Sequence, residues 1–157
     1  MTIDKLQQAI KHLSIVDVYL TASQARHGEG FSPKAAHALE GLAVQTMHLV
    51  RLSEVRETEQ PDQFILRVVL GFGVRWVREE DAEGKEPDIK ALVEADYVAE
   101  YLMDERLDQE AIDAFALQNA SYHVWPYWRE YLMSQCERLR MPRLILPIQQ
   151  FPDNKKQ

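Results

Sequence analysis

The sequence predicts an α+β fold, in which a four-stranded antiparallel sheet is followed by a short and a long helix. Three features of the 157-residue chain support this class. Four segments before the last third alternate apolar and polar residues, as strands with one buried face do. Polar turns between several of these segments favour antiparallel pairing. The last third changes to the three-four apolar spacing of helices, and helices that follow a complete sheet cover one of its faces.

The strand signal is strongest in residues 64–78, FILRVVLGFGVRWVR. Every second position from Phe64 to Trp76 is apolar, which predicts a long strand with one face buried in the core. Gly71 and Gly73 lie on the opposite face and leave it bare. We therefore expect another side chain or backbone segment to pack closely there, as at a contact surface, or else a bulge or bend.

Three further segments are predicted strands, namely residues 13–22, 45–56 and 89–101. Residues 81–88 are a charged turn region with Gly84 and Pro87, so the strands on either side of it are predicted to form a hairpin. Alternation in the last strand places Leu92 in the set of residues that is predicted to be solvated. Between the first two strands, residues 32–42 are predicted to form a short helix or a structured loop, because Ser32 fits an N-cap.

The final third is predicted to be helical. Asp108 is a candidate N-cap for a short helix that ends near Asn119, and a second helix extends from Ser121 to about Arg140. Pro126 is expected to kink this helix or delay its start. An extended segment, residues 141–151, follows. We expect one domain over residues 1–152 and a disordered polar tail over residues 153–157.

Charge and composition exclude several classes of function. The formal net charge of −7 opposes binding to phosphate backbones, so no nucleic-acid partner is expected. Cys136 is the only cysteine, as expected for a reducing compartment. The N-terminal residues lack the pattern of a signal peptide, and no apolar run approaches the ~20 residues of a membrane span. These features predict a cytoplasmic protein that does not insert into membranes.

Sequence signatures of catalysis are missing. The five histidines form no metal-binding pair, and the chain has no glycine-rich phosphate loop, so no metal and no cofactor are expected. Cys136 and His123 are a possible nucleophile and base only if the fold brings them together, and Cys136 lies among the aromatic residues of a predicted helix. The sequence therefore predicts a binding or interaction protein and not an enzyme.

Two blocks in the last third resemble the SecB family of protein-export chaperones. VWPYWRE (124–130) is similar to the start of that family's long helix, and MPRLILP (141–147) to the segment after it. The triplet Leu92-Val93-Glu94 and the order of strands and helices also match. The Cys-Pro-Asn that usually precedes the long helix is replaced by residues 120–122, Ala-Ser-Tyr. The chain is accordingly identified as a divergent member.

The resemblance implies an ATP-independent chaperone, or holdase, that binds unfolded preproteins or other non-native polypeptides and transfers them to a partner such as the SecA motor. It also implies a homotetramer that is a dimer of dimers. The alternative is a SecB-like adaptor or a dedicated chaperone for one partner, for example a toxin–antitoxin pair. A holdase protects many unrelated proteins, whereas an adaptor binds one.

The resemblance also implies two sets of site residues. Client-binding candidates come from the crossover between the first two strands and from the adjacent strand and helix, although each is also a plausible core residue. They are Phe31, Leu39, Leu42, Val44, Met47, Leu49, Trp125 and Trp128. Asp17, Leu92 and Glu94 match the family's contacts for the basic, zinc-containing tail of SecA, with Leu92 as an exposed apolar residue in an acidic surround. Thr21 replaces a further glutamate of that set.

Overall fold

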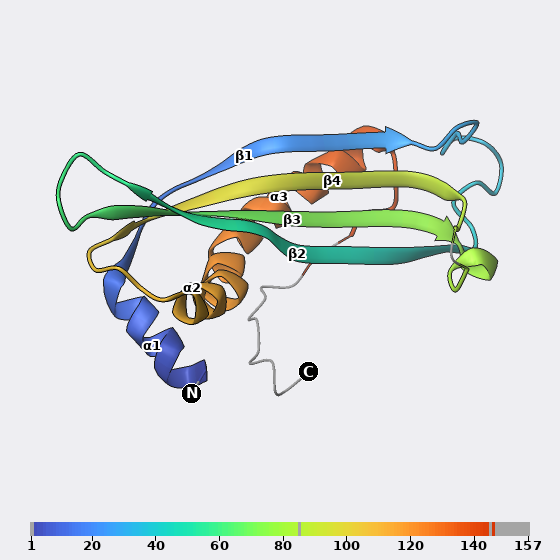
Figure 1. Ribbon diagram of the computed structural model, residues 1–157. Coiled ribbons are helices and arrows are strands. Elements are labelled where there is room, and N and C mark those ends of the chain that lie inside the picture. The colour runs from blue at the N-terminus through green and yellow to red at the C-terminus, as the bar shows by residue number, and fades with distance from the viewer. Residues whose placement is uncertain (1, 85, 145, 147–157) are drawn as a thin grey trace.

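A computed structural model describes residues 2–84, 86–144 and 146. Its main feature is one antiparallel sheet of four long strands in the order β1-β4-β3-β2 (Figure 1). The strands are β1 (Leu13–His27), β2 (Leu42–Glu57), β3 (Phe64–Arg78) and β4 (Ile89–Met103). All four predicted strands are confirmed, and β3 has the predicted bounds. The tail predicted at 153–157 lies outside the described residues, as do Pro147 and Phe151.

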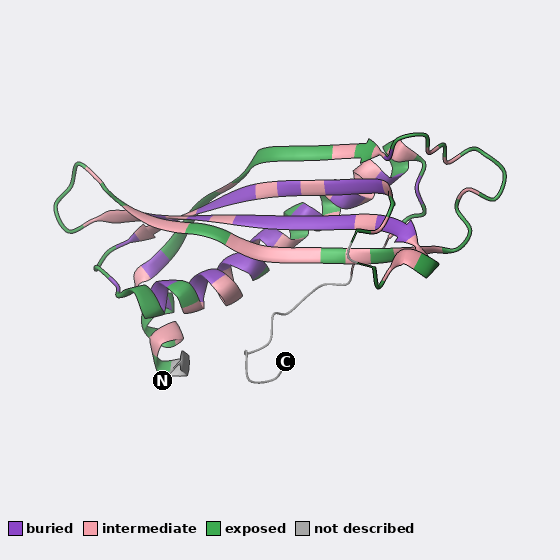
Figure 2. Ribbon diagram, turned by 45° about the vertical axis from the view of Figure 1, so that its right-hand side comes forward, coloured by how far each residue is buried: buried purple, intermediate pink, exposed green. Residues whose placement is uncertain are grey.

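The inner face of the sheet, which the helices cover, carries the core. Along β3 the predicted apolar set is buried from Leu66 to Trp76, with exposed fractions between 0 and 3%. On β4, the residues from Ala91 to Tyr101 that face the same way are also buried, and Figure 2 shows both central strands largely in purple. The period-two pattern therefore marks the buried face correctly on β3.

The two glycines of β3 lie on the outer face, and side chains of β2 cover them. The register from Gly71 to Gly73 is unbroken on both sides of β3, so the alternative of a bulge at the glycines is wrong. The register shift lies in β2 instead, where Arg51 is the extra residue between Val50 and Leu52. A Cβ atom on Gly71 would lie 2.6 Å from Nε of Arg51. The bulge directs the Arg51 side chain over Gly71, so a larger residue at this position would displace that side chain.

The helices after the sheet form as predicted. Short α2 (Gln109–Phe115) begins at Asp108, whose side chain accepts a hydrogen bond of 2.9 Å from the backbone N–H of Ala111. One π-helical turn joins α2 to the long α3 (Ser121–Leu139). The long helix runs through Pro126 from Ser121 onward, so the proline does not delay its start. Arg140 ends it in the left-handed conformation, with φ of 61°.

An N-terminal helix, α1 (Thr2–His12), was not predicted. It packs against α2, and Ala9 is fully buried in the contact. Lys5 forms an ion pair with Asp108, and this hydrogen bond raises the pKa of Lys5 and lowers that of Asp108. His12 lies 2.8 Å from a carboxylate oxygen of Asp104. The three-four spacing of Leu6, Ala9 and Leu13 was the available sequence signal.

The crossover loop, residues 28–41, is a series of turns and not a helix, so the structured-loop alternative is correct. Backbone hydrogen bonds fix both of its ends. The N–H of Gly28 donates to the carbonyl of Lys90 at 2.7 Å, and that of Glu79 donates to the carbonyl of Gly41 at 2.9 Å. His37 in the middle adopts a positive φ of 61°, which an α-helix does not allow. The loop therefore has anchored ends and an exposed middle.

Candidate functional site

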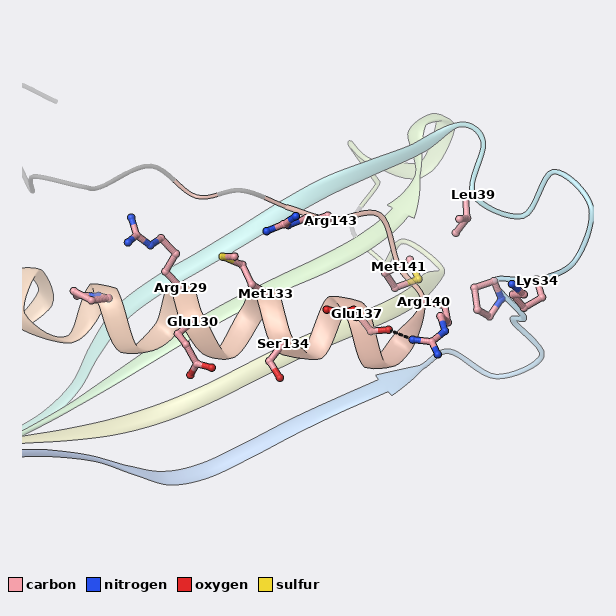
Figure 3. A pocket seen from close by; sticks show the side chains of 12 residues that line it. Lys34, Leu39, Arg129, Glu130, Met133, Ser134, Glu137, Arg140, Met141 and Arg143 are labelled. Carbon is pink, nitrogen blue, oxygen red and sulfur yellow. Dashed lines mark hydrogen bonds between the residues drawn. The ribbon is translucent and has the colours of Figure 1, made fainter.

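A groove of about 990 Å³ lies between the outer side of α3, the crossover loop and the residues that follow α3 (Figure 3). Three segments that are distant in the sequence form it. The lining residues are Pro33, Lys34, Leu39, Pro126, Arg129, Glu130, Met133, Ser134, Glu137, Arg140, Met141 and Arg143. Because it is long and open to solvent, the groove offers a surface for an extended ligand.

The periodicity of α3 explains why this surface is free. One side of the helix packs on the inner face of the sheet through Val124, Trp128 and Leu132, each no more than 2% exposed. The opposite side carries Arg129 and Met133, which line the groove. A helix that covers one sheet face leaves its far side without contact from that sheet. The groove is therefore built on the helix side that the chain's own core does not use.

The groove combines apolar and charged chemistry. Leu39, in the crossover loop, is 38% exposed, and the half-buried Met133 supplies an adaptable apolar contact, whereas Met141 is only 6% exposed. Arg140 closes the C-terminal end of α3, where its Nη1 donates a 2.6 Å hydrogen bond to the carbonyl oxygen of Glu137. Such a lining can bind apolar side chains of a peptide while the rim contacts its polar groups.

An aromatic cluster lies beneath α3 and holds the helix on the sheet. The Phe72 ring stacks on His48 at 5.1 Å and on Trp128 at 5.6 Å between ring centroids. Nε2 of His48 lies 2.8 Å from the hydroxyl oxygen of Ser121, at the start of α3. Burial lowers the pKa of His48, so the neutral imidazole is favoured in this contact. Trp128 is therefore a core residue, which is the alternative that the sequence left open for each client-binding candidate.

The eight predicted client-binding residues do not share one surface. Of these, only Leu39 lines the groove. The register places Val44 opposite Trp76 on the inner face, where it is 42% exposed, and Met47 opposite Gly73 on the outer face. Leu49 also lies on the outer face. The remaining four pack partly or fully against the core, namely Phe31, Leu42, Trp125 and Trp128.

The predicted partner face on β4 also needs correction. Leu92 lies on the outer face as predicted, but only 5% of it is exposed. Its register neighbours are Arg26 on β1 and Arg75 on β3, so it lies between basic residues and not in an acidic surround. Leu92 and Glu94 do line one hollow of about 480 Å³ together with Met47.

Asp17 lies far from that hollow. It pairs with Glu100, which is six positions along β4 from Glu94. At ~3.4 Å per residue this corresponds to about 20 Å. Glu94 accepts a 3.1 Å hydrogen bond from the amide of Gln24. The structure therefore brings Leu92 and Glu94 together but not Asp17.

Sequence reasoning missed most of the groove. Arg129, Met133 and Glu137 recur every four residues, outside the buried stripe of α3 that contains Trp128, and this pattern was visible in the sequence. Their association with Pro33 and Arg143 depends on the tertiary path of the chain. Across the described ranges, no group of three or more His, Cys, Asp or Glu residues is placed to hold a metal ion. Within the same ranges, no helix is long and apolar enough to cross a membrane.

The sheet order, its strand lengths and the long covering helix define the SecB-like fold, and comparison with solved structures confirms it. The Mycobacterium tuberculosis Rv1957 SecB-like chaperone, solved in complex with a ChAD peptide from the Rv1956 HigA1 antitoxin, superposes with a TM-score of 0.66. The alignment covers 96% of this chain and 99% of that chain at 19% sequence identity. No protein-family model matches the sequence, and no curated protein does. The fold is thus shared at a sequence divergence that the comparisons with family models and with curated proteins do not detect.

Proposed function

We propose that this protein is an ATP-independent chaperone that binds non-native polypeptide segments in the groove beside α3. The observation that carries the proposal is that the exposed Leu39 of the crossover loop, at 38%, and the half-buried Met133 of α3 line the same groove, on a helix side that the sheet does not cover. A binding surface for unfolded chains needs apolar contacts of this kind in a soluble frame. The SecB-like fold supports the same function, which is binding and not catalysis.

A dedicated role for one partner is the second candidate. The Rv1957 chaperone, which shares the fold, binds a peptide from an antitoxin. Handover to a SecA-type motor would require the outer sheet face to bind a basic tail, and Arg26 and Arg75 lie on either side of Leu92 there. Like charges disfavour that contact. These observations favour the dedicated role over general export.

A homotetramer remains part of the proposal. The outer edge of the sheet is formed by β1, where Ile15, Val16 and Leu20 are 43–58% exposed. An unpaired edge strand with apolar side chains invites pairing with a second copy. Sedimentation at micromolar concentration should therefore detect a tetramer or, failing that, a dimer. A species that remains at 18.2 kDa would contradict this part.

Suppression of aggregation tests the function. The protein should slow aggregation of chemically unfolded proteins without nucleotide, and Leu39→Asp combined with Met133→Asp should abolish the effect. The matched control is Leu52→Asp, because Leu52 is 46% exposed on β2 and lies away from the groove. Protection of one partner alone favours the dedicated chaperone. Absence of protection and of peptide binding would refute both candidates.

A further inference from the structure

We propose that the outer face of the sheet binds an acidic segment of a partner protein, at a site centred on Leu92. The site shares no residue with the groove beside α3, so the inference goes beyond the proposed function. Figure 1 shows the described helices on the other side of the sheet, which leaves the outer face without a covering layer from this chain. The resemblance to SecB assigns Leu92 and Glu94 to a basic tail, whereas the charges around Leu92 favour a segment of the opposite sign.

The cross-strand register places a row of three residues at the centre of the site. Arg26 of β1 and Arg75 of β3 are both register neighbours of Leu92 on β4. Because neighbouring strands are ~4.8 Å apart, the backbones of the two arginines lie about 10 Å from each other. Arg26 is exposed and Arg75 is half-buried. The row therefore presents one apolar side chain between two cations.

A hollow of about 480 Å³ lies next to this row. Gly73 has no side chain, and the register places it between Met47 of β2 and Glu94 of β4. The half-buried Met47 supplies an apolar wall that can adapt to a ligand. Arg75 and Leu92 line the same hollow. The site can thus take up an apolar side chain next to the arginines.

Other arginines on the outer face pair with carboxylates of the chain. Nε of Arg51 lies 2.7 Å from a carboxylate oxygen of Asp96. Glu54 pairs with Arg56 at 2.8 Å and with Arg67 at 3.6 Å. The positive charge of that part of the face is therefore compensated within the protein.

Arg26 and Arg75 contact neutral side chains instead. Nε of Arg75 donates to the amide oxygen of Gln45 at 2.6 Å. Nε of Arg26 donates to the amide oxygen of Gln24 at 3.3 Å. Among the described residues, no ion pair joins either arginine to a carboxylate. Since each amide occupies Nε, a ligand carboxylate can bind the two terminal nitrogens of a guanidinium group with parallel hydrogen bonds.

Glu94 is the one carboxylate among the described residues that line the hollow. Its Oε1 accepts a 3.1 Å hydrogen bond from the amide of Gln24. A carboxylate at the rim repels an acidic ligand and attracts a basic one. Neutralising Glu94 should therefore have opposite effects on the two kinds of partner.

An acidic segment with an apolar residue at its centre matches these features. On an extended segment every second side chain points the same way, so a leucine and the glutamates two positions on either side of it face the sheet together. The leucine contacts Met47 and Leu92, and the glutamates bind the two arginines. Because these arginines are partly solvated, each charge pair contributes modestly and is weakened by salt.

Three short labelled peptides test the preference with the intact protein. They share one leucine, and the residues two positions on either side of it are glutamate, serine or lysine. Fluorescence anisotropy should give an affinity about fivefold higher for the glutamate peptide than for the serine peptide, from two exposed charge pairs. The lysine peptide should bind most weakly, and the differences should shrink as salt rises.

Two double variants locate the preference. Arg26→Gln with Arg75→Gln should remove it, because both cations beside Leu92 are lost. The control, Arg56→Gln with Arg67→Gln, makes the same charge change on the same face at arginines that already pair with Glu54, and it should keep the preference. Both variants should suppress aggregation and sediment as the wild type does.

A single substitution distinguishes an acidic partner from a basic one. Glu94→Gln should raise the affinity for the glutamate peptide about threefold, because it removes a repulsive charge. A face that selects a basic tail should instead bind the lysine peptide best and lose affinity with this change. The matched control is Asp17→Asn, since Asp17 lies opposite Glu100, away from the hollow, and should change neither affinity.

Each contrary result has a distinct meaning. Equal affinity for the glutamate and serine peptides, or tightest binding of the lysine peptide, overturns the inference. So does loss of the preference in the control pair, which attributes it to overall charge, or a changed oligomeric state in the Arg26 and Arg75 variant, which places a second copy on this face. A glutamate peptide with glycine in place of leucine that binds as tightly shows a general anion site and also overturns it. Suppression of aggregation measures the proposed function separately, so none of these results affects that function.

Discussion

The two faces of the sheet are buried by different means. On the inner face, Phe72 is fully buried beneath a separate helical layer that is held by stacked rings. On the outer face, Leu92 is 5% exposed and Val98 fully buried, although the described helices lie on the other side (Figure 1). Long side chains of the same sheet, such as Arg51 over Gly71, provide the cover there. A rigid layer and a layer of movable side chains can thus give similar burial.

The difference concerns how easily each face can be opened. The inner face can be exposed only by moving α3 away from the sheet, which breaks many contacts together. The outer face can be exposed by rotating surface side chains, at the cost of weak ion pairs such as that between Arg51 and Asp96. Low exposure on the outer face therefore does not exclude partner binding there.

The largest expected effect comes from the inner face. Phe72→Ala should lower the free energy of unfolding by about 3–5 kcal/mol, because the stacked cluster is too tightly packed to close the cavity. Leu92→Ala should cost no more than about 2 kcal/mol, since arginine side chains can move into the space. Urea unfolding of the two variants measures both values. Equal losses would show that the outer face is as rigid as the inner one.

Two glycines compare contact with rigid backbone, at Gly28, to contact with a movable side chain, at Gly71. A Cβ atom on Gly28 would lie 2.0 Å from the carbonyl oxygen of Ile89, which is backbone and cannot rotate away. Gly28→Ala should therefore cost about 1–3 kcal/mol. Gly71→Ala should change stability by less than about 1 kcal/mol, because it only displaces Arg51 and adds β-strand propensity. Thermal unfolding compares them, and a larger loss at Gly71 would contradict the assignment of movable cover.

The smallest expected effect is a dependence of the unfolding free energy on pH, caused by the partly buried His48 and His123. Burial lowers the pKa of His48 and of His123 from the ordinary value of 6.5. As pH falls below 6.5, the unfolded chain therefore binds more protons than the folded chain. Stability decreases from there until the pH reaches the pKa values of the folded state. His48→Gln should reduce this loss, as measured by urea unfolding above and below pH 6.5. An unchanged dependence would show that His48 does not contribute to it.

Local sequence was sufficient for the sheet and for the two helices after it, but not for α1 or for the groove. Alternation along β3 and the N-cap at Asp108 are visible within a few residues, and both are confirmed. The burial of Leu92 depends on cross-strand register, which the alternation of a single strand does not reveal. The wrong grouping of Val44 with Met47 was avoidable, because residues three apart on a strand point to opposite faces.

The anchored ends of the crossover loop have a consequence for how a ligand is released. The hydrogen bonds of Gly28 and Gly41 tie the loop to the ends of β4 and β3, so displacement of its middle leaves the sheet in place. Leu39 in that middle section can then move relative to Met133 on α3. The groove therefore has one wall fixed by the helix and one adjustable wall formed by the loop. A groove with one adjustable wall accepts side chains of different size at similar association rates. Discrimination between clients should then reside mainly in how long each remains bound.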